Sequence, residues 1–546
     1  MKYGQKTRQK KYREVWQEYC GFLDLTTEEY MGIQYRLLGE QIPIWASSGL
    51  GQSFLRGKMP ETAAEFREMV PLTSYQDYAD ILLGKQSHML PGEPVIWLST
   101  TWEGGKHPEK VAPYTRAMLD VFRENLLAAT TLSSCDEHKQ AKLTDGDRVL
   151  FGLAPLPYVT GLFPLVFQEE IRFKFLPPVE EAHTMSFGER NRKGFSMGVN
   201  QGIELFFGMT SVTYYITANF GAMMKQGSGG KKLSKLLHMS PRMLYRLLHA
   251  MYTCKKEERE VMPKDIFRLK ALVCAGTDTA SYKEALHEAW GIEPMEAFAG
   301  TEVAMVGTET TTRRGMVFFP NSNFYEFIPE DEVYRSMDDP AYVPSTVLMD
   351  QLVADHNYEL VVTNLKGGAF ARYRVGDMFR CISTGGDKST RLPLLVPVDR
   401  VPSVIDIAGF TRITENSISD VVELSGLPIG HWIAKKEYDN KRRPYLHLYL
   451  ELKAESLDSV AISKQVIKEH LQVYFNYFDT DYEDLKKMLG IDPLVITILK
   501  CGTVEAFEKK TGKKLRRVNP KTYELAELLQ YDPWMDGNDG RLKHDE

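Results

Sequence analysis

The sequence of 546 residues lacks most of the short patterns that mark common site types. Its six cysteines are scattered and none form a C-x-x-C pair, so neither a zinc ribbon nor a disulfide framework is indicated. No G-x-S-x-G element occurs, which disfavours a serine hydrolase with a nucleophile elbow. The glycine-rich run at 227–230 has no G-K-[ST] ending, which argues against a P-loop. The histidines His107, His183 and His356 have no metal-ligand spacing.

Long apolar runs and a strong net charge are also missing. No uninterrupted apolar run approaches the roughly 20 residues that a transmembrane helix needs. The first residues are basic, but no apolar segment follows them as it would in a secretory signal. Lys plus Arg is 67 and Asp plus Glu is 73, a net charge of −6 that gives no support to a nucleic-acid surface. We therefore expect a cytoplasmic protein with no nucleic-acid partner and no membrane insertion.

The chain is long enough for two or more domains. Residues 10–70 show the three- and four-residue apolar spacing of amphipathic helices. Three short apolar runs end in polar or proline-containing loops and predict strands, at 95–101, 149–154 and 269–277. A helix is expected at 279–289, and 295–298 leads into Thr301-Glu302. Alternating strands and helices predict an α/β fold with a largely parallel sheet, whose ligands bind beyond the carboxyl ends of its strands.

The residue composition and the hydrophobic pattern of the sequence change after Asp377. Residues 384–389 are rich in turn formers, and the alternating run 445–452 predicts a half-exposed strand. Two helices are expected after it, at 459–478 and 482–489. We therefore predict a large α/β domain at 1–402 and a smaller α+β domain at 403–546.

Two short segments about seventy residues apart carry the residues best suited to chemistry, AFAGTE at 297–302 and RYRVGD at 372–377. Glu302 is a hard oxygen donor beside the hydroxyl of Thr301, which suits it to bind magnesium next to a phosphate. Asp377 can accept hydrogen bonds from both hydroxyls of a ribose, and Gly376 allows the backbone to come close. Arg372 and Arg374 flank this segment as candidates for pairing with phosphate.

In this order and spacing, the two segments resemble the Thr-Glu and Tyr-Arg-x-Gly-Asp elements of adenylate-forming enzymes. Further segments are similar to the auxin-responsive acyl-acid amido synthetases, the Gretchen Hagen family. They are PNSNFYEFIP at 320–329, YELVVTN at 358–364 leading to RYRVGD, VPLTSYQDY at 70–78 and CGTVE at 501–505. The matches run from about residue 70 to about residue 520, which is nearly the whole chain.

The resemblance implies a large N-terminal domain of the adenylate-forming type and a small mobile C-terminal one. It implies that magnesium ATP converts a carboxylic acid to an acyl-adenylate, which then reacts with an amine, commonly an amino acid. The products are an amide, AMP and pyrophosphate. Ala275-Gly276-Thr277 would then lie near the adenine and Thr301 near the α-phosphate, and Arg400 with residues 406–410 would mark the hinge.

The family's phosphate loop corresponds to residues 99–110, so the resemblance implies nucleotide contacts for Ser99, Thr100, Thr101 and Lys110. The loop departs from the family pattern, because Thr100 replaces its first glycine and Trp102-Glu103 intrude. A glycine there lets backbone amides approach a phosphate, so phosphate binding is expected in altered form.

Two further roles are expected. Thr511-Gly512-Lys513 resembles the lysine ending of adenylating enzymes, so Lys513 would reach the α-phosphate as a point charge, with Arg517 as a competitor. The acyl pocket is expected to include Tyr158, Phe324 and Tyr325, because such pockets are mostly apolar and aromatic.

Three functional interpretations follow. The first is an acid–amine ligase. The second is an acyl-CoA ligase, and the third is a non-catalytic nucleotide- or acyl-binding protein, which the altered phosphate loop favours. The sequence leaves the acid, the amine and the oligomeric state open.

Overall fold

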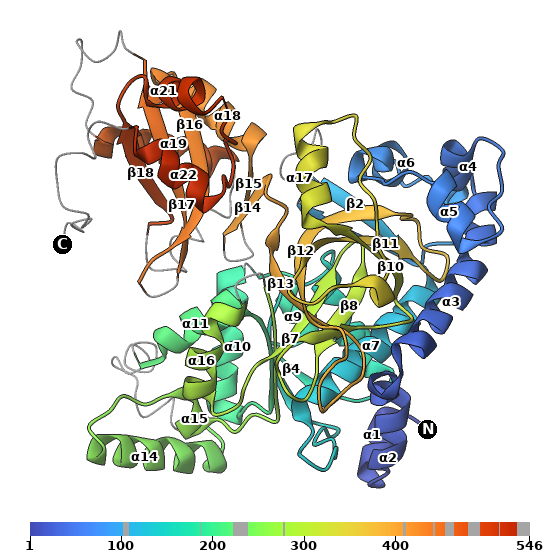
Figure 1. Cartoon of the computed structure of the whole chain (residues 1–546). Helices are drawn as coiled ribbons and strands as arrows, with labels where there is room; N and C mark the ends of the chain where they lie inside the picture. The colour runs from blue at the N-terminus through green and yellow to red at the C-terminus, as the bar shows by residue number, and fades with distance from the viewer. Residues whose placement is uncertain are drawn as a thin grey trace. The chain divides into compact units, whose positions relative to one another are not determined.

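A computed structural model describes residues 1–101, 109–185, 187–221, 239–276, 279–407, 411–440, 443–453, 464–478, 492–512 and 514–531. These residues fall into two compact units (Figure 1). The first takes in the described residues through Asp399 and the second those from Arg400 onward. The division of labour expected on either side of residue 402, and the mobility of the smaller domain, stay predictions.

Helices dominate the first part of the chain, as the spacing at 10–70 predicts. The longest of them, α3 (Thr27–Ser47), begins with a capping box in which Thr26 Oγ1 accepts from the Glu29 amide at 3.2 Å. Its neighbours are α1 (Tyr3–Arg8), α2 (Tyr12–Val15), η1 (Trp16–Cys20), η2 (Gly21–Asp24), α4 (Gly49–Leu55), α5 (Ala63–Met69), η3 (Tyr75–Asp77), α6 (Ala79–Leu83) and η4 (Ser87–Met89).

The remaining helices of the first unit lie between strands. They are α7 (Arg116–Ser134), η5 (Val159–Gly161), α8 (Leu162–Gln168), α9 (Val179–Ala182), α10 (Phe187–Gln201), α11 (Thr210–Ala218), α14 (Pro241–Lys256), α15 (Pro263–Ile266), α16 (Thr279–Trp290), α17 (Glu330–Asp338) and η6 (Met349–Gln351). Within the described ranges, no helix is both long and apolar enough to span a bilayer.

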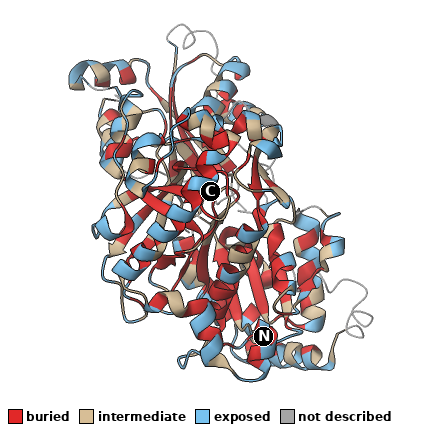
Figure 2. Ribbon diagram, turned by 90° about the vertical axis from the view of Figure 1, so that its right-hand side faces the viewer, coloured by how far each residue is buried: buried red, intermediate tan, exposed pale blue. Residues whose placement is uncertain are grey.

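An eleven-stranded sheet forms the centre of the first unit, in the order β10-β11-β12-β13-β9-β8-β7-β6-β5-β3-β4. Its strands are β3 (Arg148–Gly152), β4 (Lys174–Leu176), β5 (Leu205–Met209), β6 (Ala271–Ala275), β7 (Met295–Gly300), β8 (Ala304–Glu309), β9 (Met316–Phe318), β10 (Asn323–Pro329), β11 (Asn357–Asn364), β12 (Tyr373–Ser383) and β13 (Leu394–Arg400). The strands are mostly buried (Figure 2). This architecture confirms the predicted α/β class.

The sheet is parallel in one half only, which corrects the expectation of a largely parallel sheet. Strands β4, β3, β5, β6 and β7 pair in parallel, whereas β7–β8, β8–β9, β9–β13, β10–β11 and β11–β12 pair antiparallel. The reason is connection length. The parallel strands are joined by helices, while short turns join β7 to β8 and β8 to β9, and such turns favour antiparallel neighbours.

The strand expected at 95–101 lies outside this sheet. It is β1 (Ile96–Thr101), and it pairs antiparallel with β2 (Glu109–Tyr114) as a separate two-stranded ribbon. An apolar run of this length does not by itself distinguish a central strand from a hairpin strand, which explains the difference.

The second unit is built on a three-stranded sheet in the order β16-β17-β18, with a short β14–β15 ribbon beside it. Its elements are β14 (Val404–Ile407), β15 (Thr411–Thr414), α18 (Glu415–Ser425), β16 (Ile429–Tyr438), β17 (Pro444–Leu452), α19 (Lys464–Phe478), β18 (Leu494–Leu499), α21 (Thr503–Thr511) and α22 (Thr522–Leu529). The α+β character predicted for this part is confirmed. The helix expected at 482–489 lies outside the described residues.

The prediction of a half-exposed strand at 445–452 is wrong. β17 is buried along nearly its whole length because it is the central strand, antiparallel to β16 and parallel to β18. The alternating polar residues do not mark a solvent face. His447 and Glu451 are buried and form hydrogen bonds with neighbouring groups instead.

Candidate functional site

The carboxyl ends of the parallel strands bring several of the predicted site residues to one edge of the sheet. β6 and β7 pair through Cys274 and Glu296, so the same register places Ala275-Gly276 at the end of β6 level with Ala297-Phe298 of β7. Thr301 and Glu302 follow directly from β7. Parallel strands of an open sheet present their ligand-binding loops at this edge, so the structure supports the expected grouping of these four residues.

Three side chains from three other strands hold the turn that carries Glu302. The Tyr114 hydroxyl donates to the Thr301 carbonyl at 2.9 Å, and Asn364 Nδ2 donates to the Glu302 carbonyl at 3.0 Å. Asn323 Nδ2 donates to the Val303 carbonyl at 2.7 Å. Three consecutive carbonyl groups are therefore fixed by side chains of β2, β11 and β10, which makes the backbone under Glu302 rigid.

The two asparagines also hold each other. Asn323 and Asn364 are register partners across β10 and β11, and Asn364 Nδ2 lies 2.9 Å from Asn323 Oδ1. Sequence reasoning missed both residues. The available signal was an asparagine at the start of one apolar strand and another at the end of the next, where an amide can satisfy the backbone of an adjacent turn.

Glu302 meets a lysine and a tyrosine that are distant in the sequence. Lys110 Nζ lies 2.8 Å from Glu302 Oε1 and 3.1 Å from the Tyr373 hydroxyl, which itself lies 3.1 Å from the same carboxylate oxygen. The side chains of Lys110 and Glu302 are 14% and 13% exposed. The structure thus joins elements of three predicted motifs, the phosphate loop, the Thr-Glu pair and RYRVGD, into one cluster.

Aromatic rings surround the lysine of this cluster. Lys110 Nζ lies 5.6 Å from the ring centroid of Tyr75 and 5.9 Å from that of Tyr373, within the range of cation–π attraction. Burial raises the pKa of Tyr75 to about 12, so its hydroxyl stays neutral at physiological pH. The lysine is therefore oriented by one carboxylate and two aromatic side chains.

The β1–β2 ribbon places the two ends of the predicted phosphate loop together. Thr100 is the register partner of Lys110, Ser99 of Val111 and Thr101 of Glu109. The Ser99 amide donates to the Pro157 carbonyl at 2.9 Å, which brings the segment before Tyr158 alongside β1. Trp102 and Glu103, the intruding residues, lie outside the described part of the chain.

Asp377 lies in a bulge of β12. Glu359 pairs with Met378 and Val361 with Arg374, so Leu360 alone faces Val375, Gly376 and Asp377. Gly376 has φ of 80°, a left-handed conformation that favours glycine. Asp377 is buried. Bulges of this kind redirect side chains near active sites, which accounts for the glycine before the aspartate.

Other predicted residues have different surroundings. Arg372 and Arg374, candidates for phosphate pairing, instead bind the buried carboxylates of Glu326 and Glu359. Arg400 is the last residue of β13 and the residue at which the second unit begins, and its Nε lies 3.8 Å from Asp406 Oδ2. Thr277 and Lys513 lie outside the described residues.

The three residues expected in the acyl pocket differ in exposure. Tyr158 is 39% exposed, whereas Phe324 and Tyr325 are buried in the core. The Tyr325 hydroxyl donates to the carbonyls of Val306 and Phe319 at 3.1 and 3.0 Å. Of the three, Tyr158 is the one whose side chain a ligand can reach without opening the core.

A buried acidic pair lies on β7 and β8, in the same sheet as the Glu302 turn. Glu309 Oε2 accepts from the Glu296 amide at 2.8 Å, and Glu309 is paired with Lys283 of α16. Burial, followed by the charge of Glu309, raises the pKa of Glu296 to about 8. Burial also raises the pKa of Glu309. A proton held on Glu296 at neutral pH limits the repulsion between the two carboxyl groups.

This pair predicts a pH-dependent stability. The pKa of Glu296 in the folded protein lies above its ordinary value of 4.5, so as pH rises the unfolded chain loses this proton before the folded protein does. The free energy of unfolding therefore falls as pH rises from about 5 to about 8. Glu296→Gln keeps a neutral side chain there and is expected to stabilise the protein at pH 8 by roughly 1–3 kcal/mol, with little effect at pH 5. Urea unfolding at both pH values measures this. The control Glu284→Gln, at an exposed position on α16, should leave the pH dependence unchanged. If the free energy of unfolding changed with pH equally in Glu296→Gln and in the unmodified protein, the raised pKa assigned to Glu296 would be contradicted.

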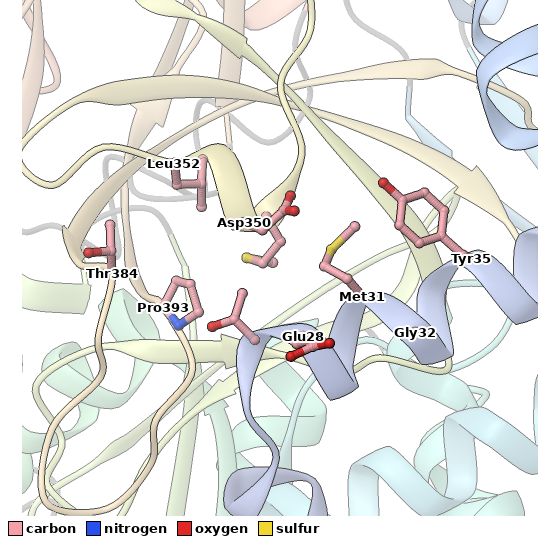
Figure 3. Close-up of a pocket in the computed structure, with 10 residues that line it drawn as sticks. Glu28, Met31, Gly32, Tyr35, Asp350, Leu352, Thr384 and Pro393 are labelled. Atoms are coloured by element: carbon pink, nitrogen blue, oxygen red, sulfur yellow. The ribbon is translucent and has the colours of Figure 1, made fainter.

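A groove of about 600 Å³ opens elsewhere on the first unit (Figure 3). It lies between the first half of α3 and η6, with Glu28 and Asp350 on its walls and Met31, Tyr35, Leu352 and Pro393 around them. None of the predicted site residues that the structure describes lines it. The groove is therefore distinct from the Lys110–Glu302 cluster.

Comparison with a known family identifies the middle of the chain. Residues 316–388 match the central domain of the GH3 family. This segment is similar to the GH3 central domain. It runs from β9 to the loop after β12 and contains Asn323, Asn364, Tyr373 and Asp377. The family resemblance predicted from the sequence is confirmed over this segment.

Two solved structures are similar to nearly the whole chain. The acyl acid amido synthetase AtGH3.15 in complex with 2,4-DB is 15% identical, with a TM-score of 0.54 over 95% of this chain and 96% of that one. A 2-hydroxyisobutyryl-CoA ligase in complex with 2-HIB-AMP and CoA is 14% identical, with a TM-score of 0.53 over 92% of each chain. At these identities the likeness shows the fold alone, which this chain shares with both enzymes. A search among curated proteins found no match.

Proposed function

We propose that the protein is an ATP-dependent ligase that activates a carboxylic acid as an acyl-adenylate and transfers the acyl group to an amine. The adenylate-forming fold and the GH3 central domain support this. The single observation that carries it is the Lys110–Glu302 contact, which joins residues 192 positions apart at the carboxyl edge of the sheet. A cation and a hard anion held together there suit a site for a metal-bound triphosphate.

In the first half-reaction, a carboxylate oxygen of the acid attacks the α-phosphorus of ATP and pyrophosphate leaves. Lys110 supplies positive charge to the phosphates, and Ser99, Thr100 and Thr101 line the same loop. Asp377 accepts from the ribose hydroxyls, and Ala275, Gly276 and Thr277 border the adenine. Because the turn under Thr301 and Glu302 is fixed, these groups need little reorganisation as charge develops.

In the second half-reaction, the amine nitrogen attacks the acyl carbon, AMP leaves and the amine loses a proton. Lys513 and Arg400 are proposed to contact the nucleotide, as the resemblance implies. Tyr158 is the proposed contact for the acid. We propose an amino acid as the amine and the cytoplasm as the location.

Magnesium fits the donor set of the first unit. Mg²⁺ bound to a nucleotide usually takes only one or two protein carboxylates and completes its shell with phosphate oxygens and water. Glu302 provides one such carboxylate, and no cluster of three ligating side chains occurs among the described residues. Glu302 would therefore hold the ion together with the nucleotide, and the ion would neutralise phosphate charge.

An acyl-CoA ligase is the second candidate, because one of the two similar folds belongs to such an enzyme. The two candidates share the first half-reaction and differ in the nucleophile of the second. A nitrogen nucleophile gives an amide and the CoA thiol gives a thioester.

Pyrophosphate release tests the proposal. The protein is incubated with magnesium ATP and a panel of aromatic, indolic and aliphatic carboxylic acids, without amine. Acid-dependent release is expected, and adding amino acids or CoA separately to the best acid then identifies the acceptor. ATP binding without release for any acid would reject the proposal in favour of a nucleotide-binding protein with an altered 99–110 loop.

A further inference from the structure

Helix α14 carries apolar side chains on the face that points away from the protein. Met243, Ala250 and Cys254 are buried against the first unit. On the opposite side, Tyr245, Leu248, Met251 and Tyr252 are 69%, 56%, 56% and 72% exposed. The spacing of Tyr245, Leu248 and Tyr252 places them in one stripe at the outermost line of the helix.

The residues of this stripe lie too close together on one helical face to be isolated exposed apolar residues. Single exposed apolar side chains are ordinary, but a contiguous group on one helical face marks an interaction surface. In Figure 1, α14 lies along the lower edge of the first unit, well away from β2, where Lys110 is found. The stripe is therefore not part of the proposed nucleotide site.

The charged residues of α14 itself are all positive, and the exposed acidic residues Glu257, Glu258 and Glu260 follow only beyond its C-terminal end. α14 contains Arg242, Arg246, Lys255 and Lys256 and no acidic residue. The sequence has no Asp or Glu between Glu204 and Glu257, although acidic residues outnumber basic ones over the whole chain. The helix itself is therefore cationic on a protein whose net charge is −6.

We propose that the outer face of α14 binds the surface of an anionic lipid bilayer. An interfacial helix lies in the membrane plane, with its apolar face among the acyl chains and its Lys and Arg side chains at the headgroups. Tyr245 and Tyr252 have an apolar ring and a polar hydroxyl, which suits them to this boundary. Lys255 and Lys256 can extend along the helix to anionic headgroups while the stripe inserts.

Charge complementarity favours a bilayer over a second copy of this chain. Two α14 faces packed together would place Arg242, Lys255 and Lys256 of one copy near the same residues of the other, and like charges oppose that contact. An anionic bilayer attracts each basic residue near its surface. This inference does not depend on the proposed function, because the stripe and the Lys110–Glu302 cluster share no residue.

Vesicle co-sedimentation of the full chain tests the proposal. Binding to phosphatidylcholine vesicles containing phosphatidylserine is expected to exceed binding to phosphatidylcholine alone by about tenfold, and to fall at high salt. Two variants remove one attraction each. The apolar variant carries Tyr245→Ser, Leu248→Ser and Tyr252→Ser, and the charge variant carries Arg242→Gln, Lys255→Gln and Lys256→Gln. Each should weaken binding to the anionic vesicles about tenfold or more.

Matched controls separate a local surface from general effects. The apolar control changes three equally exposed residues elsewhere, Val343→Ser, Val353→Ser and Leu424→Ser. The charge control removes the same net charge at exposed positions, through Arg56→Gln, Lys58→Gln and Lys85→Gln. Both controls should bind vesicles like the unmodified protein, and all four variants should keep its melting temperature to within a few degrees.

Two outcomes overturn the proposal. One is that the α14 variants and their controls bind anionic vesicles equally well. The other is that sedimentation velocity shows a dimer that the apolar variant dissociates, with no binding to either type of vesicle. That second result would assign the stripe to self-association.

Discussion

Glu302→Gln is expected to lower acid-dependent pyrophosphate release at least about a hundredfold while the fold stays intact. The substitution keeps the size and hydrogen-bonding capacity of the side chain, so contacts with Lys110 and Tyr373 can persist. It removes the negative charge that binds the metal and balances the lysine. A neutral amide oxygen is a much weaker ligand for Mg²⁺ than a carboxylate.

Geometry explains why the effect should be large. The carbonyls of Thr301, Glu302 and Val303 are each held by a separate side chain, so the turn cannot shift easily to present another ligand. Within the described residues there is no group of three ligating side chains from which a substitute could come. Loss of one preorganised charge at such a site commonly costs two to three orders of magnitude, roughly 3–4 kcal/mol.

The control for this experiment is Asp355→Asn. Asp355 also pairs with a cation, Arg380, but both side chains are exposed. Its replacement removes the same charge and should change pyrophosphate release less than about twofold. Raising the magnesium concentration should restore part of the activity of Glu302→Gln if the lost group is a metal ligand. A variant with near-normal release would exclude Glu302 from the reaction and leave its pairing with Lys110 a purely structural contact.

The sequence was a better guide to which segments form the candidate site than to the contacts that join them. Thr301-Glu302 and RYRVGD could be placed because each follows an apolar strand and carries residue types that a nucleotide needs. Their link through Lys110 could not be derived, because it depends on the β1–β2 ribbon crossing to the turn after β7. Such a contact between distant segments has no local pattern in the sequence.

Strand context explains the predictions that differ from the structure. The run at 445–452 alternates as a half-exposed strand does, yet β17 is central, and its polar side chains are satisfied by partners. His447, for example, meets Glu437 through Nδ1 and Thr497 through Nε2, both at 2.8 Å. The alternating pattern of the sequence shows only which side chains differ in polarity. Whether both faces of a central strand are buried depends on the elements that pack against it.

The sequence also did not show that the arginines of RYRVGD pair with buried carboxylates, and this pairing leads to the second prediction with a large expected effect. Arg372→Met is expected to lower the free energy of unfolding by roughly 3 kcal/mol. Arg372 Nε and Nη2 donate to the two oxygens of the Glu326 carboxylate at 3.1 and 3.0 Å, and Nη1 donates to the Val70 carbonyl at 2.8 Å. Glu326 is 1% exposed, so removal of this partner leaves a buried charge with less compensation.

A second arginine limits the loss. Arg67 Nε lies 2.9 Å from Glu326 Oε1, and the Thr346 hydroxyl donates to the same oxygen at 2.7 Å. Because these contacts remain in Arg372→Met, the cost should fall at the lower end of the range for a broken buried pair. The double variant Arg372→Met/Glu326→Gln should recover part of the stability, since it removes the charge that was left unpaired.

Urea unfolding compares these variants with Arg380→Met, which breaks the exposed pair with Asp355 and should cost less than about 1 kcal/mol. If Arg372→Met cost no more than Arg380→Met, the buried pair would not stabilise the fold, and the phosphate role first inferred for Arg372 would regain support. If it costs roughly 3 kcal/mol, Arg372 stabilises the start of β12, where the next residue is Tyr373. The arginine then contributes to catalysis indirectly, because the strand that it anchors carries the hydroxyl in contact with Lys110 and Glu302.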